Sequence, residues 1–406
     1  MTDRSPSSSA SSTRLAFWTC AAVLALALWT SGAPTTVYPL YASDWHLAPV
    51  WTTAIFAVYP LALVVVLLVF GDLSDYIGRR GSILLGVLAS MIGVLLFAVA
   101  PGIAWVLVGR ALMGIGVGLS LSPATARMID LAGPAASART SSIATASTAT
   151  GLALATLIGG ALVQYGPAPL HLTFWVLLVV EVVVFVGVWR LPADRDTAAG
   201  RWRPRGIRIP RSLLGVVAAA ALCVSASYTL GAIVLSLGAD IGADLVGSSN
   251  AFVTGLIITV SAVVIGVVAI LTRNVSPAIA APVGAVVTAA ALGLLVLAGI
   301  EHSLVLFLGF TALGGAGYSL FFSAGLALVG RFAPAHHRAG TLSAVYLVAY
   351  LFQGAIALWL GSVATAGGLE RAVDVGAPVV VAIGVVALVL VLTLARPRKA
   401  PAVATL

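Results

Sequence analysis

Charged residues are rare in this chain, so those that interrupt its apolar segments are the first candidates for chemistry. Only 8% of the 406 residues are charged. The stretch GDLSDYIGRR, residues 71–80, nevertheless places two acids, two arginines and two glycines between two apolar runs. Carboxylates and guanidinium groups at such close spacing can form charge-assisted hydrogen bonds with one another or with helix ends. This stretch therefore predicts ion pairs or helix-end contacts among these groups.

Two further charges stand inside apolar runs and suggest proton chemistry. Arg110 lies in VLVGRALMGIGVGLS and Glu181 lies in LLVVEVVVFVG. A charge at the centre of a bilayer costs at least about 2.5–3.5 kcal/mol, so it is rarely idle. We expect burial to keep Glu181 protonated much of the time, with Arg110 as a candidate partner. The alternatives are an arginine that extends to the outer surface and a neutral, hydrogen-bonded glutamate on a peripheral helix.

The elements that carry these residues are membrane-spanning helices. The chain is 61% hydrophobic, and its charged fraction is far below the roughly 25% of a soluble protein. Apolar runs recur along the whole length, each near the roughly 20 residues that a helix needs to cross a bilayer. A membrane β-barrel would instead show alternating segments of about ten residues. The sequence predicts an all-α polytopic membrane protein.

Twelve spans are expected, split six and six by one long polar connection. They cover approximately 15–40, 50–70, 81–100, 103–130, 140–165, 170–190, 212–237, 249–272, 278–299, 303–330, 339–364 and 375–395. The predicted domains are a disordered N-terminus at 1–14, a six-helix bundle at 15–190, a linker at 191–211, a second bundle at 212–395 and a tail at 396–406. We interpret the arginines of the linker as a solvated surface facing lipid headgroups.

The basic residues predict the orientation. With the N-terminus inside, 19 of the 21 lysines and arginines fall on the cytoplasmic side, Arg371 falls outside and Arg110 falls within a span. Excess positive charge on the cytoplasmic side is the usual determinant of topology. Both termini are therefore expected in the cytoplasm, and the net charge of +8 gives no support to nucleic-acid binding.

The two halves repeat each other weakly. GVGLSL at 116–121 matches GAGYSL at 315–320, an offset of 199, and Arg139 matches Arg338 at the same offset. Parallel repeats of this kind place a substrate site between the halves near the middle of the membrane.

In these features the whole chain resembles the major facilitator superfamily, whose members are secondary transporters with two six-helix bundles related by a pseudo-two-fold axis. The signature of the family's loop between spans two and three is a glycine, an acid four positions on, another glycine and paired basic residues. The resemblance implies that this loop clamps the halves on the inner side when the carrier faces outward. A turn that only fixes topology is the alternative. The residues that fit the clamp, including an acid at the end of span four, are Gly71, Asp75, Gly78, Arg79, Arg80 and Asp130.

Two more spans bear on the resemblance. The family has an arginine in span four followed by spaced glycines, which Arg110 and Gly114 resemble, and it is linked to proton transfer in proton-coupled members. Drug exporters of the family show a Gly-Pro pair in span five, where this chain has Ala155 and Thr156. That departure leaves the exchange of drug for proton open, and the glycines of this span are equally well explained by helix packing.

By analogy with the family, spans one, four, seven and ten line the cavity, and spans two, five, eight and eleven flank them. Their polar and aromatic tips suit hydrophobic or neutral solutes better than anionic ones, although each single residue has packing as its alternative. The candidates are Thr35, Tyr38, Tyr59, Ser120, Tyr228, Asn250, Phe321, Tyr346, Tyr350 and Gln353.

The resemblance predicts a secondary transporter of the inner (plasma) membrane that works by alternating access. We expect proton-coupled efflux of hydrophobic, drug-like molecules, with a proton symporter for a sugar, amino acid or organic acid as the alternative. The expected partners are a small-molecule substrate, protons and the lipid bilayer, with the protein as a monomer. Cys20 and Cys223 lie in apolar runs and predict no disulfide. No cofactor, metal site or enzyme active site is expected.

Overall fold

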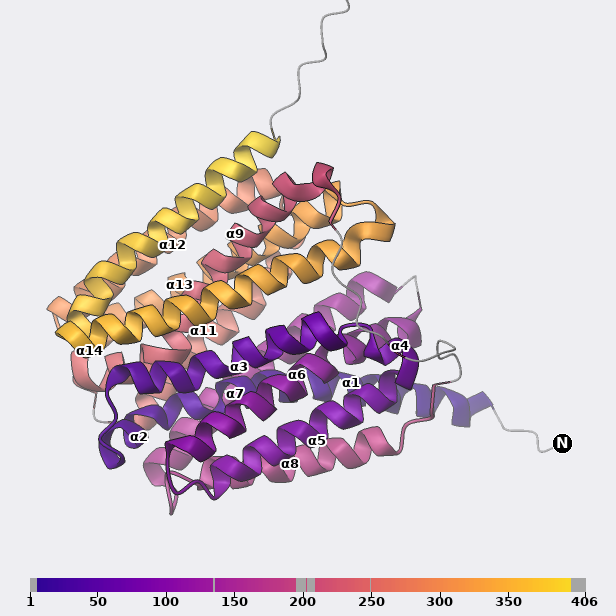
Figure 1. The fold of residues 1–406 in the computed structure, drawn as a ribbon, viewed down its shortest axis with the longest axis horizontal. Helices are drawn as coiled ribbons and strands as arrows, with labels where there is room; N and C mark the ends of the chain where they lie inside the picture. The colour runs from indigo at the N-terminus through magenta and orange to yellow at the C-terminus, as the bar shows by residue number, and fades with distance from the viewer. Residues whose placement is uncertain (1–5, 134–135, 195–201, 203–208, 249, 396–406) are drawn as a thin grey trace, which may run out of the picture.

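The computed structural model describes residues 6–133, 136–194, 202, 209–248 and 250–395, and every regular element among them is helical (Figure 1). Eleven of the described helices are long and apolar enough to cross a membrane. The last of them continues through Gly368, whose φ of 87° breaks the helical path, so it supplies two spans. The twelve spans predicted from the sequence are therefore confirmed in the described part of the chain.

The first six spans form the N-terminal bundle, shown in indigo to pink in Figure 1. Its elements are α1 (Pro6–Gly32), η1 (Ala33–Thr36), α2 (Tyr38–Asp44), α3 (Pro49–Phe70), α4 (Leu73–Ile77), α5 (Arg79–Ala98), α6 (Ile103–Ala132), α7 (Ser137–Tyr165) and α8 (Leu172–Trp189).

The remaining spans form the C-terminal bundle, which runs to yellow in Figure 1. Its elements are η3 (Arg211–Leu213), α9 (Leu214–Ala232), η4 (Ile233–Leu237), α10 (Gly238–Asp240), η5 (Ile241–Leu245), α11 (Ala251–Leu271), α12 (Pro277–Ile300), α13 (Leu304–Phe332) and α14 (Ala335–Ala395).

Three helix boundaries differ from the expectation. The first helix begins at Pro6, so residues 6–14 are helical and only part of the segment predicted to be disordered lies outside the described residues. A polar Ser/Ala segment can extend a helix that the apolar span has already nucleated. Span seven continues past residue 237 to Leu245 through two wide turns. The loop expected at 365–374 is reduced to the kink at Gly368, because one residue at positive φ is enough to reverse the chain.

The two bundles meet at one end of the molecule, here called the far end, which carries α2 and the Gly368 kink. Their ribbons diverge toward the opposite end, called the linker end, which carries α4 and the start of the linker (Figure 1). The hydrogen bonds that join the bundles include Thr35 Oγ1 to the Leu235 carbonyl at 3.0 Å, the Val50 N–H to Thr365 Oγ1 at 2.9 Å, the Ala251 N–H to Gln164 Oε1 at 2.8 Å, and the Thr156 and Thr259 hydroxyls at 2.7 Å. The structure therefore has its far end closed.

Small residues set the spacing between helices within each bundle. A Cβ on Gly116 of α6 would lie 2.5 Å from the Gly86 carbonyl oxygen of α5. In the C-terminal bundle, a Cβ on Gly317 of α13 would in the same way collide with Thr288 of α12. Glycine allows this close approach because it lacks a side chain.

These contacts correct the register of the internal repeat. Gly116 and Gly317 each face the third span of their bundle, an offset of 201, and α6 and α13 begin at Ile103 and Leu304, again 201 apart. The letter match at an offset of 199 is therefore wrong by two residues. Glycines at every second position match equally well after a shift of two, so the sequence could not fix the register.

Candidate functional site

The first part of the site is the linker-end cluster around residues 71–80. Gly78 has φ of 79°, as its position in a tight turn predicts, and lets α4 pass directly into α5. Arg79 forms an ion pair with Asp130 at the end of α6, which is the pairing expected from the sequence. Both side chains are partly exposed, so the pair contributes little to stability by itself. Its action as a clamp stays a prediction.

Arg80 turns the other way and closes the end of α8. Its guanidinium donates hydrogen bonds to the carbonyls of Val188 and Trp189, and it lies 5.8 Å from the centre of the Trp189 ring. A cation at the carbonyl end of a helix is favoured by the helix dipole. Arg80 therefore ties the start of α5 to the end of α8 within one bundle.

Asp194, at the start of the linker, binds the N-terminal end of α5. Its Oδ2 accepts a hydrogen bond from the Arg80 N–H at 2.8 Å, and its Oδ1 pairs with Arg127 of α6 at 2.7 Å. Arg127 also donates to the Pro192 carbonyl at 2.7 Å. An acid at a helix N-terminus satisfies free N–H groups there. The linker thus caps α5 directly.

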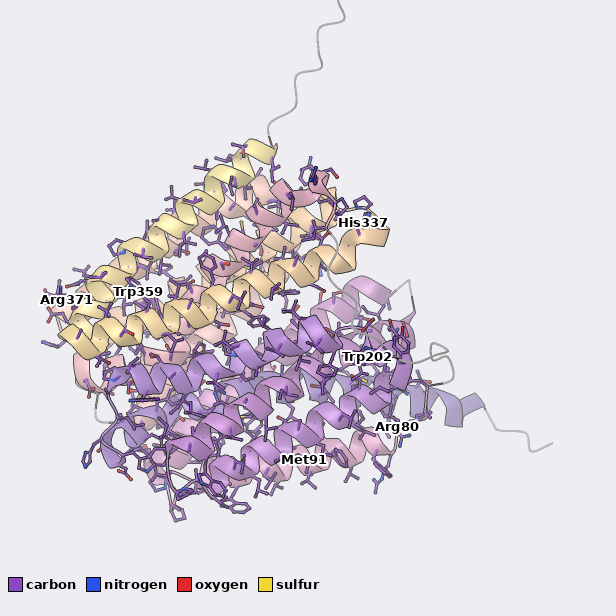
Figure 2. All side chains as sticks on the ribbon, in the orientation of Figure 1. Arg80, Met91, Trp202, His337, Trp359 and Arg371 are labelled. Atoms are coloured by element: carbon purple, nitrogen blue, oxygen red, sulfur yellow. The ribbon has the colours of Figure 1, made fainter. Side chains whose placement is uncertain are left out.

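The linker makes a second contact further on. The indole N–H of Trp202 donates to Asp72 at 2.9 Å, and its ring stacks on Phe70 with centroids 5.1 Å apart. Figure 2 shows Trp202 and Arg80 at the linker end of the N-terminal bundle, and His337 at the same end of the other bundle. The linker therefore contacts the N-terminal bundle at Asp194 and Trp202. Of its arginines, which we expect to be solvated, Arg211 is exposed and the others lie outside the described residues.

Two members of the predicted clamp do not take part in this cluster. Asp75 is exposed, and in the described part of the chain its side chain forms no ion pair or hydrogen bond. Gly71 is also exposed, and a Cβ there would meet the Leu67 carbonyl of its own helix, not a neighbouring helix. Gly71 therefore does not serve close packing between helices, which its place in the motif would otherwise suggest, because residues 71–72 are a turn that separates α3 from α4.

Arg110 is fully buried inside the N-terminal bundle, so the alternative that it extends to the surface is wrong. Its guanidinium donates to the Ser31 carbonyl of α1 at 3.1 Å and to the Ile55 carbonyl of α3 at 3.2 Å. The same group lies 5.0 Å from the centre of the Tyr59 ring, and Tyr38 is within its electrostatic reach. Arg110 therefore joins three spans through carbonyl groups and aromatic rings.

Glu181 of α8 is fully buried as well, and it meets α1 at Thr30, next to the Ser31 that Arg110 contacts. Its Oε1 accepts a hydrogen bond from Thr30 of α1 at 3.1 Å, its Oε2 has no hydrogen-bond partner, and Ser90 of α5 lies close by. No ion pair joins it to Arg110 among the described residues. The suggested Arg110–Glu181 partnership is therefore wrong, since Arg110 is already held by backbone carbonyls.

Aromatic side chains gather where the C-terminal bundle faces the other bundle, and we call this set the aromatic wall. Tyr228 of α9 is its centre: the ring of Tyr350 lies 4.8 Å away, and those of Phe322 and Tyr318 lie 6.1 and 6.2 Å away. Tyr346 extends the set beside Phe322 and Tyr350. Tyr350 packs against the apolar cores of both bundles, so the wall reaches the interface.

Three predicted cavity residues are placed elsewhere. Phe321 is fully buried behind the wall, against Gly284 of α12 and Gly384 of α14. Ser120 hydrogen-bonds the Gly116 carbonyl of its own helix and packs on α5. Asn250 caps α11 by accepting from the N–H groups of Phe252 and Val253. In each case a packing or capping requirement decided the direction of the side chain.

The other predicted residues lie on or near the interface. Thr35 bonds across it, Tyr38 is buried beside Arg110, and Gln353 is half-buried one turn beyond Tyr350 on α14. Their contact with a substrate stays a prediction.

Several residues of the site were missed from the sequence. Asp194 and Trp202 stand in a polar linker that gave no periodic signal, whereas Tyr318 stands in the repeated GAGYSL segment and could have been included. Asp240 was missed because it lies beyond the predicted end of span seven.

Twelve spans in two bundles, buried charges in one and an aromatic wall in the other define a polytopic membrane transporter. The model of the Major Facilitator Superfamily matches residues 17–282. The chain belongs to this family, and it is a transporter and not an enzyme.

One curated relative and several solved structures are similar to it. The multidrug efflux pump LfrA of Mycolicibacterium smegmatis is 32% identical over 213 residues, which cover 50% of this chain and only 40% of the relative. A bacterial homologue of the human lysosomal transporter Spinster, in an inward-facing and unoccupied conformation, superimposes with a TM-score of 0.73 at 15% identity, covering 98% of this chain and 100% of that one. The POT family transporter PepTSo gives 0.74 at 14% identity, covering 94% and 97%. At these identities the structures show the fold alone.

Proposed function

We propose that the chain exports hydrophobic small molecules across the plasma membrane in exchange for protons. The observation that carries this proposal is the aromatic wall at the interface between the bundles. Its rings offer apolar area and hydroxyl tips without a fixed charge, which suits hydrophobic solutes and disfavours anions. The name of the relative LfrA, a multidrug efflux pump, supports the same substrate class.

The proposal includes an orientation and a cycle. The linker end faces the cytoplasm because the basic residues gather there. The N-terminal bundle (15–190) and the C-terminal bundle (212–395) rock about the interface, and the clamp residues hold the linker end when the far end opens. In the present state the described contacts of Arg79 and Arg80 lie within the N-terminal bundle and at Asp194 of the linker, and none reaches the C-terminal bundle, as expected of a clamp that is disengaged.

Protons supply the energy in this proposal. One proton that enters the cell yields about 1.4 kcal/mol per pH unit and about 2.3 kcal/mol per 100 mV. Glu181 and Arg110 are the candidate coupling residues of the N-terminal bundle, because both are fully buried there.

The test is proton flux in proteoliposomes that hold the full chain and a lumenal pH dye. Lipophilic cations and neutral antibiotics are added outside vesicles with an acidic lumen. A transported compound is expected to make protons leave the lumen, and Glu181→Gln is expected to abolish this flux. Glu301→Gln is the matched control, since Glu301 is exposed at the far end of α12.

Other outcomes decide against parts of the proposal. If compound and protons enter together, the symport alternative holds. If no hydrophobic compound moves protons in either direction, the export proposal fails. If the flux persists in Glu181→Gln, that residue is structural.

The aromatic wall has its own test by direct binding. Tyr228→Ala is expected to weaken the binding of a transported compound by at least about tenfold, since a buried aromatic contact contributes about 1.5 kcal/mol or more. Tyr228→Phe keeps the ring and is expected to bind almost as well. Tyr165→Ala is the control, because Tyr165 is 69% exposed at the far end of α7. Equal binding by Tyr228→Ala and the wild type would remove the wall from the substrate site.

A further inference from the structure

Asp240 is a buried carboxyl that no part of the proposed cycle uses. Its side chain lies in α10, within span seven, and the residue is only 8% exposed. Among the described residues it has no ion pair and no hydrogen-bond donor to its carboxyl. Burying a carboxylate without a partner costs several kcal/mol, and binding of a proton removes most of that cost.

The helix around Asp240 is irregular on both sides. The wide turns of η4 and η5 flank the short α10, so the regular hydrogen-bond pattern of span seven is interrupted twice. Such wide turns are rare and frequently mark functional positions. The Leu235 carbonyl of η4 accepts the Thr35 hydroxyl from the other bundle. The broken part of span seven is therefore a contact between the bundles.

The neighbours of Asp240 place it at the same interface. Its helix packs against η1 and α2 of the N-terminal bundle and against α11 of its own. Tyr38 of α2 and Asp244 of η5 are within electrostatic reach of its carboxyl. The other ionisable residues of α2 are Tyr41, which is buried, and Asp44, which is exposed, while η1 and α11 carry none. No basic side chain of these elements faces Asp240.

Asp240 and Glu181 differ in whether the opposite bundle forms part of their surroundings, and this difference decides which of them can sense the rocking motion. Glu181 is enclosed by Thr30 and Ser90 of its own bundle, so rocking of the bundles as rigid bodies leaves its surroundings unchanged. Asp240 is enclosed partly by the opposite bundle, so opening of the far end must hydrate it. A group can couple protons to a conformational change only if its surroundings differ between the two states.

We propose that Asp240 is a proton-binding site at the interface between the bundles, neutral when the far end is closed and charged when it is open. Uptake of a proton from the far-end medium then favours closure. In the exporter proposed above, on which this role rests, that step returns the carrier after it has released its substrate. Asp240 is thus a second coupling residue, contributed by the C-terminal bundle.

The test measures the conformation and needs no substrate. Spin labels at Pro101→Cys and Glu301→Cys report the distance between the bundles at the far end, in lipid nanodiscs at mildly acidic and mildly alkaline pH. Both native cysteines are fully buried, so they should not take the label. The wild-type population with separated labels is expected to rise with pH, by up to about tenfold per unit, the limit for one linked proton.

The variants decide between Asp240 and other groups. Asp240→Asn is expected to stay closed at both pH values, and Asp240→Glu to keep the response. Asp244→Asn is the matched control, since Asp244 is exposed four residues away, and it should respond like the wild type. A full pH response in Asp240→Asn, or none in the wild type, overturns the inference.

The same variants separate this inference from the export proposal. If compounds drive proton flux but Asp240→Asn opens with pH like the wild type, only the role of Asp240 fails. If no compound moves protons while the pH response depends on Asp240, only the export proposal fails.

Discussion

The carboxylate of Asp194 lies 2.7 Å from the guanidinium of Arg127, and this pair fixes the start of the linker on the linker end of the N-terminal bundle. The same carboxylate receives the Arg80 N–H, so it also serves as the cap of α5. A residue outside the predicted bundles therefore completes the turn that begins at Gly78.

Replacing Asp194 should lower stability. Asp194→Asn removes a largely buried ion pair and weakens the cap of α5, so we expect a loss of about 1–3 kcal/mol in the free energy of unfolding. Thermal unfolding of the detergent-solubilised protein measures this. Asp374→Asn, at an exposed position of α14, should leave the melting temperature unchanged. An unaltered melting temperature in Asp194→Asn would show that the linker contact does not stabilise the bundle.

The Arg79–Asp130 pair should matter for transport more than for stability. Both groups are partly exposed, so reversing either charge should change the free energy of unfolding by less than about 1 kcal/mol. If the pair belongs to the clamp, Arg79→Asp and Asp130→Arg each lower the transport rate, and the double exchange restores part of it. Transport at the wild-type rate in both single variants would show that the loop only fixes the membrane topology and does not act as a clamp.

Arg110 should be essential for transport although its removal leaves the fold intact. Arg110→Met removes a buried charge that has no ion-pair partner among the described residues and keeps an apolar side chain of similar length, so the relief of burying a charge offsets the lost hydrogen bonds. The Ser31 and Ile55 carbonyls then lose their donor, so we expect a folded protein without proton-coupled flux. Size-exclusion chromatography and thermal unfolding check the fold, and the proteoliposome assay checks the flux. Wild-type flux in Arg110→Met would assign this arginine to packing alone.

Replacement by alanine should affect stability differently at two glycines, Gly116 of α6 and Gly293 of α12. Gly116→Ala places a Cβ 2.5 Å from the Gly86 carbonyl oxygen and should cost about 1–3 kcal/mol, because α5 and α6 must move apart. Gly293→Ala meets nothing within 4 Å and should be neutral or stabilise α12 by up to about 1 kcal/mol. Thermal unfolding of both variants measures the difference. Equal stability of the two would contradict the close packing of α5 on α6.

The sequence by itself determined the architecture. Apolar runs of spanning length fixed the twelve helices, because a bilayer leaves every backbone polar group to be satisfied within its own helix. Local chemistry also determined the positive φ of Gly78, since a glycine suits this tight turn, whereas the pairing of Arg79 with Asp130 was implied by the resemblance to the family. The motif around them was sufficient for the family, which the match over residues 17–282 confirms.

Only the tertiary structure decided which polar side chains meet. Arg110 binds carbonyls from α1 and α3, and Glu181 binds Thr30 at a distance of 151 positions along the chain. Asp240 is buried at the interface because span seven continues through two wide turns that no residue pattern announced. Every face of a span in a bilayer can be apolar, so hydrophobic periodicity does not reveal which face is turned inward. The direction of each buried side chain follows instead from the close packing of small residues across the whole fold.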